Sequence, residues 1–161
     1  MPYIAHQMQG TDFKLVPILI GNLSPKAEQK YGELLSKYLD DPSNFFVVSS
    51  DFCHWGSRFR YVWYDKSAGD IWQSIEKLDR MGMDHISKLD AAGFTSYLKK
   101  YKNTICGRHP IGVFLNAVRA YKGKGEPSLE FTHYAQSSKC RQQRDSSVSY
   151  ASAVYCQPCR Q

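Results

Sequence analysis

Two short apolar runs and several stretches with helical spacing organise the chain. Lys14 to Ile20 and Phe45 to Val48 are nearly continuous apolar runs, typical of strands covered on both faces of a sheet. Pro17 lacks an N–H, so the first strand needs an edge position or a bulge. Between the two runs, Ser24 and Pro25 predict the start of a helix, as N-cap and first helical residue.

That helix has apolar residues at spacings of three and four, which predicts one face packed on the sheet. These residues are Tyr31, Leu34, Leu35, Tyr38 and Leu39. A strand, a helix and a strand in succession form a βαβ unit, which implies a right-handed crossover and parallel strands. We therefore predict an α/β fold in a single domain over residues 1–161, with a central, mostly parallel sheet and helices on both faces.

Three further helices are expected downstream. Residues from Ile71 to Ile86 have helical spacing, and Gly82 between two methionines predicts a break or kink. Asp90 begins the next helix, which ends near Lys99 and Lys100 because basic residues suit a helix C-terminus. Pro110 then predicts a helix from Ile111 to Tyr121.

Two strands are expected near the end of the sequence. Leu129 to Ala135 alternates between two faces, and the alternation places His133 on one face with Leu129 and Phe131. Ser146 to Tyr155 is a candidate closing strand with Val148, Tyr150 and Val154 on one side.

Composition excludes several classes of protein. The 161 residues are 42% hydrophobic and 22% charged, as in an ordinary globular domain. The net charge of +6 comes from dispersed Lys and Arg, and no nucleic-acid recognition motif is visible. We therefore expect a solvated basic face and no nucleic-acid partner.

The compartment follows from the absence of targeting signals and from the cysteines. No stretch has the length of a membrane span and no leader opens the chain, so we expect no membrane insertion. Five cysteines, an odd number at scattered spacings, favour free thiols in a reducing compartment. We expect the cytoplasm, with the nucleus as a second location.

Side chains capable of chemistry follow the second apolar run directly. Ser49 and Ser50 end the run, and Asp51, Cys53 and His54 come next. Ligands of open α/β sheets bind beyond the carboxyl ends of strands. The sequence therefore predicts a site wall made of an acid, a thiol and an imidazole.

A second group of candidates surrounds Cys106. This cysteine precedes a helix N-terminus, with Gly107 and Arg108 beside it, and both the backbone amides and the cation lower a thiol pKa. A small buried hydrophobe is the alternative interpretation of a lone cysteine. A site built from Asp51, His54 and Cys106, with Cys53 and His109 as further members, is incomplete as a structural zinc set.

Two other segments leave alternatives open. Arg58 to Tyr64 interleaves arginines with aromatic residues. Such side chains can stack on nucleic-acid bases or hold an anionic peptide. The alternative is that the aromatic rings pack over the site. Cys156 and Cys159 form a Cys-x-x-Cys without a second pair or a following helix, which does not suffice for zinc or redox chemistry.

Six longer motifs stand out along the chain: Asp40-Asp-Pro-Ser-Asn, Val47-Val-Ser-Ser-Asp-Phe-Cys-His-Trp-Gly, Tyr97-Leu-Lys-Lys-Tyr, Asn103-Thr-Ile-Cys-Gly-Arg-His-Pro-Ile-Gly, Tyr134-Ala-Gln-Ser-Ser and Asp145-Ser-Ser-Val-Ser-Tyr. In these motifs and in their order the chain resembles the Memo family, mediators of ErbB-receptor-driven cell motility. The resemblance runs from Pro2 to about Tyr150 and covers the C-terminal half of a family member. From Ala151 onward the tail differs.

The resemblance implies a fold like half of a class III extradiol dioxygenase and assigns roles to particular residues. Cys106 corresponds to a metal ligand of the family and His54 to the acid/base histidine of the dioxygenases. Asp51 is expected in the same pocket. Beside these, the candidate ligand-binding residues are His109 and three arginines able to pair with phosphate, Arg58, Arg60 and Arg108. Two metal-binding histidines of the family lie in the N-terminal half, so we expect copper or iron to bind this chain weakly or not at all.

Three functions remain open at this stage. The first is a signalling effector that links receptor tyrosine kinases to microtubules and cell motility by binding a phosphotyrosine peptide of a receptor tail. Here the arginines pair with phosphate. The second is a copper- or iron-dependent redox enzyme, and the third is a truncated product with neither activity. The missing N-terminal half is an expected partner in each case.

Overall fold

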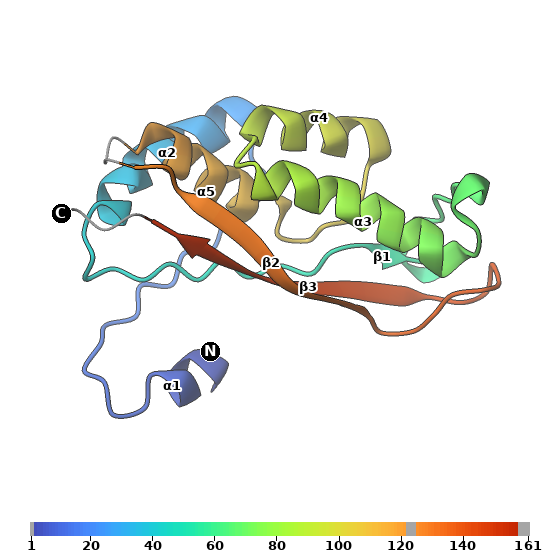
Figure 1. Cartoon of the computed structure of the whole chain (residues 1–161), viewed down its shortest axis with the longest axis horizontal. Coiled ribbons are helices and arrows are strands. Elements are labelled where there is room, and N and C mark those ends of the chain that lie inside the picture. Colours follow the sequence, from blue (N-terminus) through green and yellow to red (C-terminus); the bar gives the residue numbers. More distant parts are fainter. Residues whose placement is uncertain (1, 122–124, 158–161) are drawn as a thin grey trace.

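The computed structural model describes residues 2–121 and 125–157, and its helices outnumber its strands. The helices are α1 (Pro2–Gln7), α2 (Pro25–Leu39), α3 (Ile71–Ser87), α4 (Ala91–Tyr101) and α5 (Arg108–Ala120). The strands are β1 (His54–Trp55), β2 (Ser128–Gln136) and β3 (Ser147–Cys156). In Figure 1, α2 to α5 lie on one side of the β2–β3 ribbon, and α1 lies apart from them on the other side.

The sheet is antiparallel, so the α/β class is confirmed and the mostly parallel sheet is wrong. Within the described residues the strand order is β1-β3-β2, and both pairings are antiparallel. The helices are not distributed over both faces as predicted, because α2 to α5 share one side. A hairpin of β2 and β3, with β1 beside β3, therefore forms the sheet in place of the expected βαβ unit.

Neither apolar run of the predicted βαβ unit is a strand. Lys14 to Ile20 and Phe45 to Val48 are extended, but neither belongs to the ladders of the described sheet. Leu19 is fully exposed, and Phe45 is 84% exposed. Extended backbone becomes a strand only when a neighbour accepts its hydrogen bonds, and these two segments have no such neighbour in the described sheet.

Helix α2 begins as predicted but packs on a different element. Ser24 caps it by accepting a hydrogen bond from the Ala27 N–H at 3.3 Å, and Pro25 is its first residue. The helix lies against α5, where Gly32 approaches Asn116 so closely that a Cβ would meet the Asn116 Cβ at 2.5 Å. The predicted packing of its apolar stripe on the sheet is wrong. Tyr31, Leu34 and Tyr38 of that stripe are exposed.

Helices α3 and α4 pack against each other through a glycine. Helix α3 runs without interruption from Ile71 to Ser87, so the predicted break at Gly82 is wrong. A Cβ at Gly82 would meet the Tyr97 ring at 2.9 Å, which gives this glycine a packing role. Asp90 caps α4 as predicted, accepting from the Gly93 N–H at 2.8 Å.

An irregularity in β2 changes which residues face the core. The register with β3 shifts between Phe131 and His133, as a β-bulge does. Leu129 and Phe131 pack on the core before the shift, and Tyr134 packs on it afterwards. His133 is consequently exposed, and its predicted inward direction is wrong. A bulge cannot be read from strict alternation, which explains the error.

The predicted closing strand exists as β3 and turns its small residues inward. Ser147 and Ser149 are buried, whereas Tyr150 and Val154 are exposed. Of the Cys-x-x-Cys pair, Cys156 ends β3 and is exposed, and Cys159 lies outside the described residues. The core itself lies between α3, α4, the start of α5 and the sheet, with Trp55, Ile75, Leu78, Phe94, Ile105 and Leu115 among its most buried members.

Candidate functional site

The site is built on Ser50 to Trp55, here called the site segment, which lies beside β3. The Phe52 N–H donates to the Ser149 carbonyl at 2.8 Å, and the Ser149 N–H donates to the Cys53 carbonyl at 2.9 Å. His54 then pairs with Val148 in the sheet. Strand pairing therefore fixes one edge of the site segment.

Residues Asn103 to Gly107, here called the site loop, hold the other edge. The Asp51 N–H donates to Cys106 Sγ at 3.1 Å, and the Gly107 N–H donates to Ser50 Oγ at 2.9 Å. The Thr104 hydroxyl accepts from the His54 N–H at 2.7 Å and donates to the His54 carbonyl at 3.0 Å.

The close approach of the two segments requires a glycine in the site loop. A Cβ at Gly107 would collide with the Ser50 side chain and would lie 2.7 Å from the Ser49 carbonyl oxygen. Gly107 thus allows Cys106, the residue before it, to reach the backbone of Asp51.

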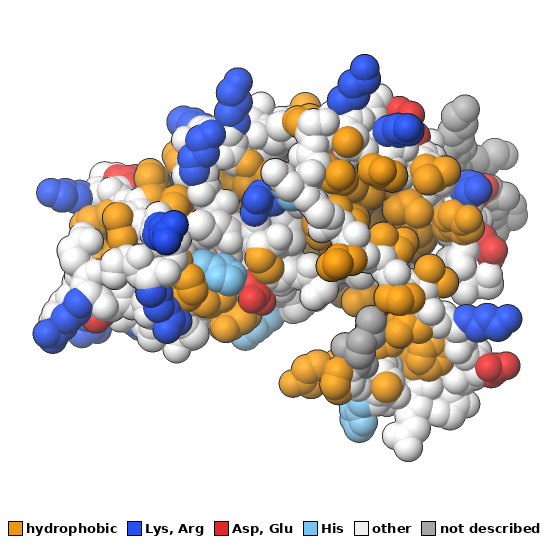
Figure 2. All heavy atoms as spheres, turned by 180° about the vertical axis from the view of Figure 1, so that it is seen from behind, with side chains coloured by type: hydrophobic (Ala, Val, Ile, Leu, Met, Phe, Trp, Pro, Cys, Tyr) orange, Lys and Arg blue, Asp and Glu red, His pale blue; other side chains and the backbone are white. Residues whose placement is uncertain are grey.

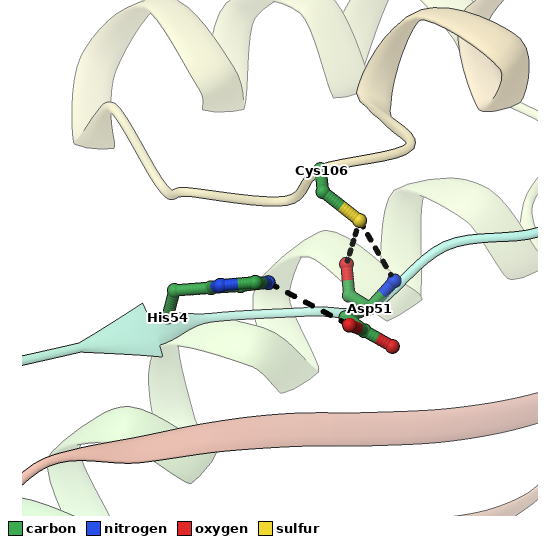
Figure 3. A group of neighbouring side chains, drawn as sticks. All are labelled: Asp51, His54 and Cys106. Carbon is green, nitrogen blue, oxygen red and sulfur yellow. Dashed lines mark hydrogen bonds and ion pairs between the residues drawn. The ribbon is translucent and has the colours of Figure 1, made fainter. Parts of the chain in front are cut away.

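Asp51, His54 and Cys106 form a cluster of three potential metal ligands (Figure 3). One ligand atom from each lies within 4.8 Å of the others, and His54 Nε2 is 3.8 Å from Asp51 Oδ2. The predicted approach of His54 and Cys106 is confirmed, although the preceding residues are extended chain and not the expected strand. A carboxylate oxygen, an imidazole nitrogen and a thiolate sulfur are a donor set that suits transition metals.

The His54 ring is held in place by an aromatic neighbour. Phe59 meets it edge-on, with ring centroids 5.2 Å apart, and the Arg58 guanidinium lies 4.5 Å from the centre of the Phe59 ring. His54 Nε2 is buried and makes no hydrogen bond to a described residue. This nitrogen therefore faces the cluster with its hydrogen-bonding capacity unused.

The other predicted ligand-binding residues lie outside the cluster. Arg58 and Arg60 are exposed, and the Arg108 guanidinium donates to the Ile105 carbonyl at 3.3 Å. His109 Nδ1 lies 2.6 Å from Glu28 Oε1, so this side chain ties α5 to α2. Of these four residues, only Arg58 contacts a neighbour of His54.

Cys53 belongs to the core and not to the cluster. Its side chain is fully buried, and burial together with the nearby Asp79 raises the pKa of its thiol. The aromatic part of the 58–64 segment likewise packs on the core, through Tyr61, Trp63 and Tyr64. That observation favours the packing interpretation of this segment over base stacking.

Three residues that shape the site were not predicted from the sequence. Ser50 and Thr104 bind the two segments together, and Asp79 on α3 accepts the Cys53 N–H at 3.2 Å. A signal existed for Asp79, because it lies four residues after Ile75 and therefore on the apolar face of its helix.

Comparison with known proteins identifies the relatives of the chain. The sequence profile described as Memo-like protein matches residues 1–154. The chain belongs to the Memo family. Protein MEMO1 of Danio rerio is 59% identical and that of Homo sapiens 58% identical, each over 157 residues that cover 96% of this chain and 53% of the relative. Protein memo-1 homolog of Caenorhabditis elegans is 45% identical over 96% of this chain and 45% of its own length.

The chain thus spans about half the length of these curated Memo relatives. Its mixed α/β structure is consistent with a Memo-like domain and with a fold like that of the class III extradiol dioxygenases. No helix in the described parts of this Memo chain is long and apolar enough to cross a bilayer.

Proposed function

We propose that this chain acts as a Memo-type signalling effector that links receptor tyrosine kinase activation to cell motility and the microtubule cytoskeleton. The observation that carries the proposal is the family match along nearly the whole chain, combined with the assembly of Asp51, His54 and Cys106 into one cluster. The proposal treats the face around His54 as a binding site for a phosphotyrosine peptide from a receptor tail.

Arg58 is the residue best placed to recognise phosphate on this face. It is exposed, and Phe59 connects it to the His54 ring. A guanidinium can donate two parallel hydrogen bonds to a phosphate, which a lysine cannot.

The test is fluorescence polarisation with a labelled phosphotyrosine peptide and its unphosphorylated form. Arg58→Ala should weaken binding of the phosphopeptide by about tenfold, as expected for loss of a charge-assisted hydrogen bond of roughly 1.5 kcal/mol. Arg119→Ala is the matched control, because Arg119 is exposed at the other end of α5 from the site loop. Equal affinity of both variants, or of both peptides, would refute the proposal.

A second candidate function is metal-dependent redox chemistry, which the ligand cluster specifically favours. The three side chains fit a copper or iron ion by donor type: the Cys106 thiolate, with the His54 imidazole and the Asp51 carboxylate beside it. A bound copper or iron ion supplies the redox chemistry that the side chains lack. His54 is suited to hold or transfer a proton at Nε2, which lies 3.8 Å from the Asp51 carboxylate.

We expect the isolated chain to bind copper or iron weakly, because the resemblance places two metal-binding histidines in the N-terminal half. Metal content after dialysis against copper or iron should be well below one ion per chain, and Cys106→Ser should lower it further. Cys156→Ser is the control, since Cys156 is the other exposed thiol described. Tight stoichiometric binding that disappears in Cys106→Ser would show that the cluster suffices as a site.

We propose that the N-terminal half of a Memo-like domain is a partner of this chain. The extended segments 14–20 and 45–48 expose Val16, Leu19 and Phe45, and Figure 2 shows hydrophobic side chains gathered over part of the rear face of the molecule. Such an apolar area, next to backbone without ladder partners, suits a polypeptide that adds strands and covers it.

Co-expression with the N-terminal half of a MEMO1 relative provides the test. The two polypeptides should co-purify, and amide hydrogen exchange should slow within residues 14–20 and 45–48. The amides of Phe52, Cys53 and His54, already hydrogen-bonded to Ser149, Asp79 and Thr104, serve as the internal reference. Co-purification without protection of the two segments would place the partner elsewhere.

A further inference from the structure

The core of the chain contains a carboxylate that has no cationic partner among the described residues. Asp79 is fully buried, and all of its described contacts are with neutral donors. Its Oδ1 accepts the Cys53 N–H at 3.2 Å and the Asn103 side-chain amide at 2.9 Å, and its Oδ2 accepts the Tyr134 hydroxyl at 2.9 Å. The Ser149 side chain on β3 also hydrogen-bonds to this carboxylate. Burying an ionisable group in this way costs free energy, so its retention calls for a specific role.

The two donors on Oδ1 come from the two segments that form the site. Cys53 lies between Asp51 and His54 in the site segment, and Asn103 is the first residue of the site loop that carries Cys106. Asn103 also donates to the Tyr97 hydroxyl at 2.7 Å, which donates in turn to the Leu78 carbonyl at 2.9 Å. One carboxylate oxygen on α3 therefore joins both halves of the site to the helical layer.

We propose that Asp79 is the positioning residue of the Asp51–His54–Cys106 cluster. By accepting both donors on one oxygen, it fixes the site segment relative to the site loop and so sets the separation of His54 from Cys106. The contact with Tyr134 on the other oxygen anchors the carboxylate to β2 and does not touch the site. The inference rests on this geometry and holds whether or not the proposed function is correct.

Burial makes this positioning dependent on pH. It raises the pKa of the Asp79 carboxyl to about 6. The titratable groups that face Asp79 have pKa values raised by burial, and they stay neutral in this range: Cys53, Tyr61, Tyr97 and Tyr134. Arg80 lies 4.9 Å from the centre of the Tyr134 ring and is the nearby cation. Protonation places a hydrogen on one oxygen and removes acceptor capacity there, which loosens the junction of the two segments.

The test follows alkylation of Cys106 by iodoacetamide in the full chain, with mass-spectrometric readout between pH 5 and pH 8. Cys156 is an exposed thiol on β3 and serves as the internal reference for reagent and thiol ionisation. The ratio of the two rates should show a step near pH 6 in the wild type, and Asp79→Asn should abolish it. A step that persists in Asp79→Asn overturns the proposal.

A second pair of variants keeps the proposal testable if Asp79→Asn does not fold. Asn103→Ala removes one donor from Oδ1, whereas Tyr134→Phe removes the Tyr134 hydroxyl from Oδ2 and leaves the Cys53 and Asn103 contacts with Oδ1. Only Asn103→Ala should change the Cys106 to Cys156 rate ratio at pH 7, with circular dichroism confirming that both variants fold. An equal change in both variants, or none in either, overturns the positioning role.

Discussion

Two neighbouring stretches of this chain carry large apolar side chains and have opposite environments. Phe45 to Val48 is extended and largely exposed, whereas Phe52 to Trp55 is paired with β3, and Phe52, Cys53 and Trp55 are buried. Hydrophobicity does not explain the difference, because the exposed stretch is the more apolar of the two. The second stretch has β3 on one edge and the site loop on the other, and the first has neither. Partners, more than intrinsic preference, decide which apolar run becomes part of a sheet.

The largest expected effect tests this comparison with one residue type in two positions. Phe52 is 4% exposed and packs edge-on against Phe131, with ring centroids 5.9 Å apart, whereas Phe45 is 84% exposed. Phe52→Ala should lower the free energy of unfolding by about 3–5 kcal/mol through lost burial and a cavity. Phe45→Ala should change it by less than about 0.5 kcal/mol. Urea denaturation measures both, and similar losses would show that Phe45 is covered in solution.

A smaller effect concerns the carboxylate that supports the buried stretch. The pKa of Asp79 rises from 3.8 to about 6 on folding, so the folded state keeps a proton that the unfolded state releases. Its contribution to stability is therefore complete below about pH 4 and is lost as the pH rises through 6. Relative to Asp79→Asn, the wild type should lose about 3 kcal/mol between pH 4 and pH 8, at 1.36 kcal/mol for each pKa unit.

Urea denaturation of the two proteins at a series of pH values gives this difference, and groups common to both cancel. A difference that stays constant with pH would mean that Asp79 keeps its ordinary pKa in the folded protein.

The smallest effect is expected at two glycines, one closely packed and one in open space. Gly32 lies at the contact of α2 with α5, where a Cβ would meet the Ala117 backbone nitrogen at 2.7 Å, whereas a Cβ at Gly21 meets nothing within 4 Å. Gly32→Ala should cost about 1–3 kcal/mol through overpacking. Gly21→Ala should be neutral or stabilise the protein by a few tenths of a kcal/mol because it restricts the unfolded chain. Thermal unfolding should rank the two variants in this order.

Local signals in the sequence predicted the elements that local chemistry determines. Ser24 and Asp90 mark the starts of α2 and α4, and the spacing from Ile71 to Ile86 predicts α3. The approach of His54 to Cys106 was also predicted. Of the sheet, the strands at 129–135 and 146–155 were predicted and exist as β2 and β3. Their antiparallel arrangement was not predicted, because the apolar run from Phe45 to Val48 carries no information about whether another strand lies beside it.

The details of the site depended on contacts between distant parts of the chain. The hydroxyl of Thr104 and the carboxylate of Asp79 bind backbone groups of the site segment, and neither residue stands near that segment in the sequence. Polar residues of this kind are common on helices and loops. Their partners become evident only once the fold brings the segments together.

The position of β3 in the sheet also constrains the order of folding. This strand lies between β1 and β2, yet it follows both in the sequence. Residues 52–55 consequently have no strand partner until Ser147 to Cys156 have left the ribosome. The chain between β1 and β3 must close into a long loop before strand pairing can stabilise the protein. Proteins dominated by such distant contacts fold slowly. A nascent chain halted before Ser147 should therefore contain α3 and α4 but leave the Cys106 thiol unpaired with the Asp51 amide.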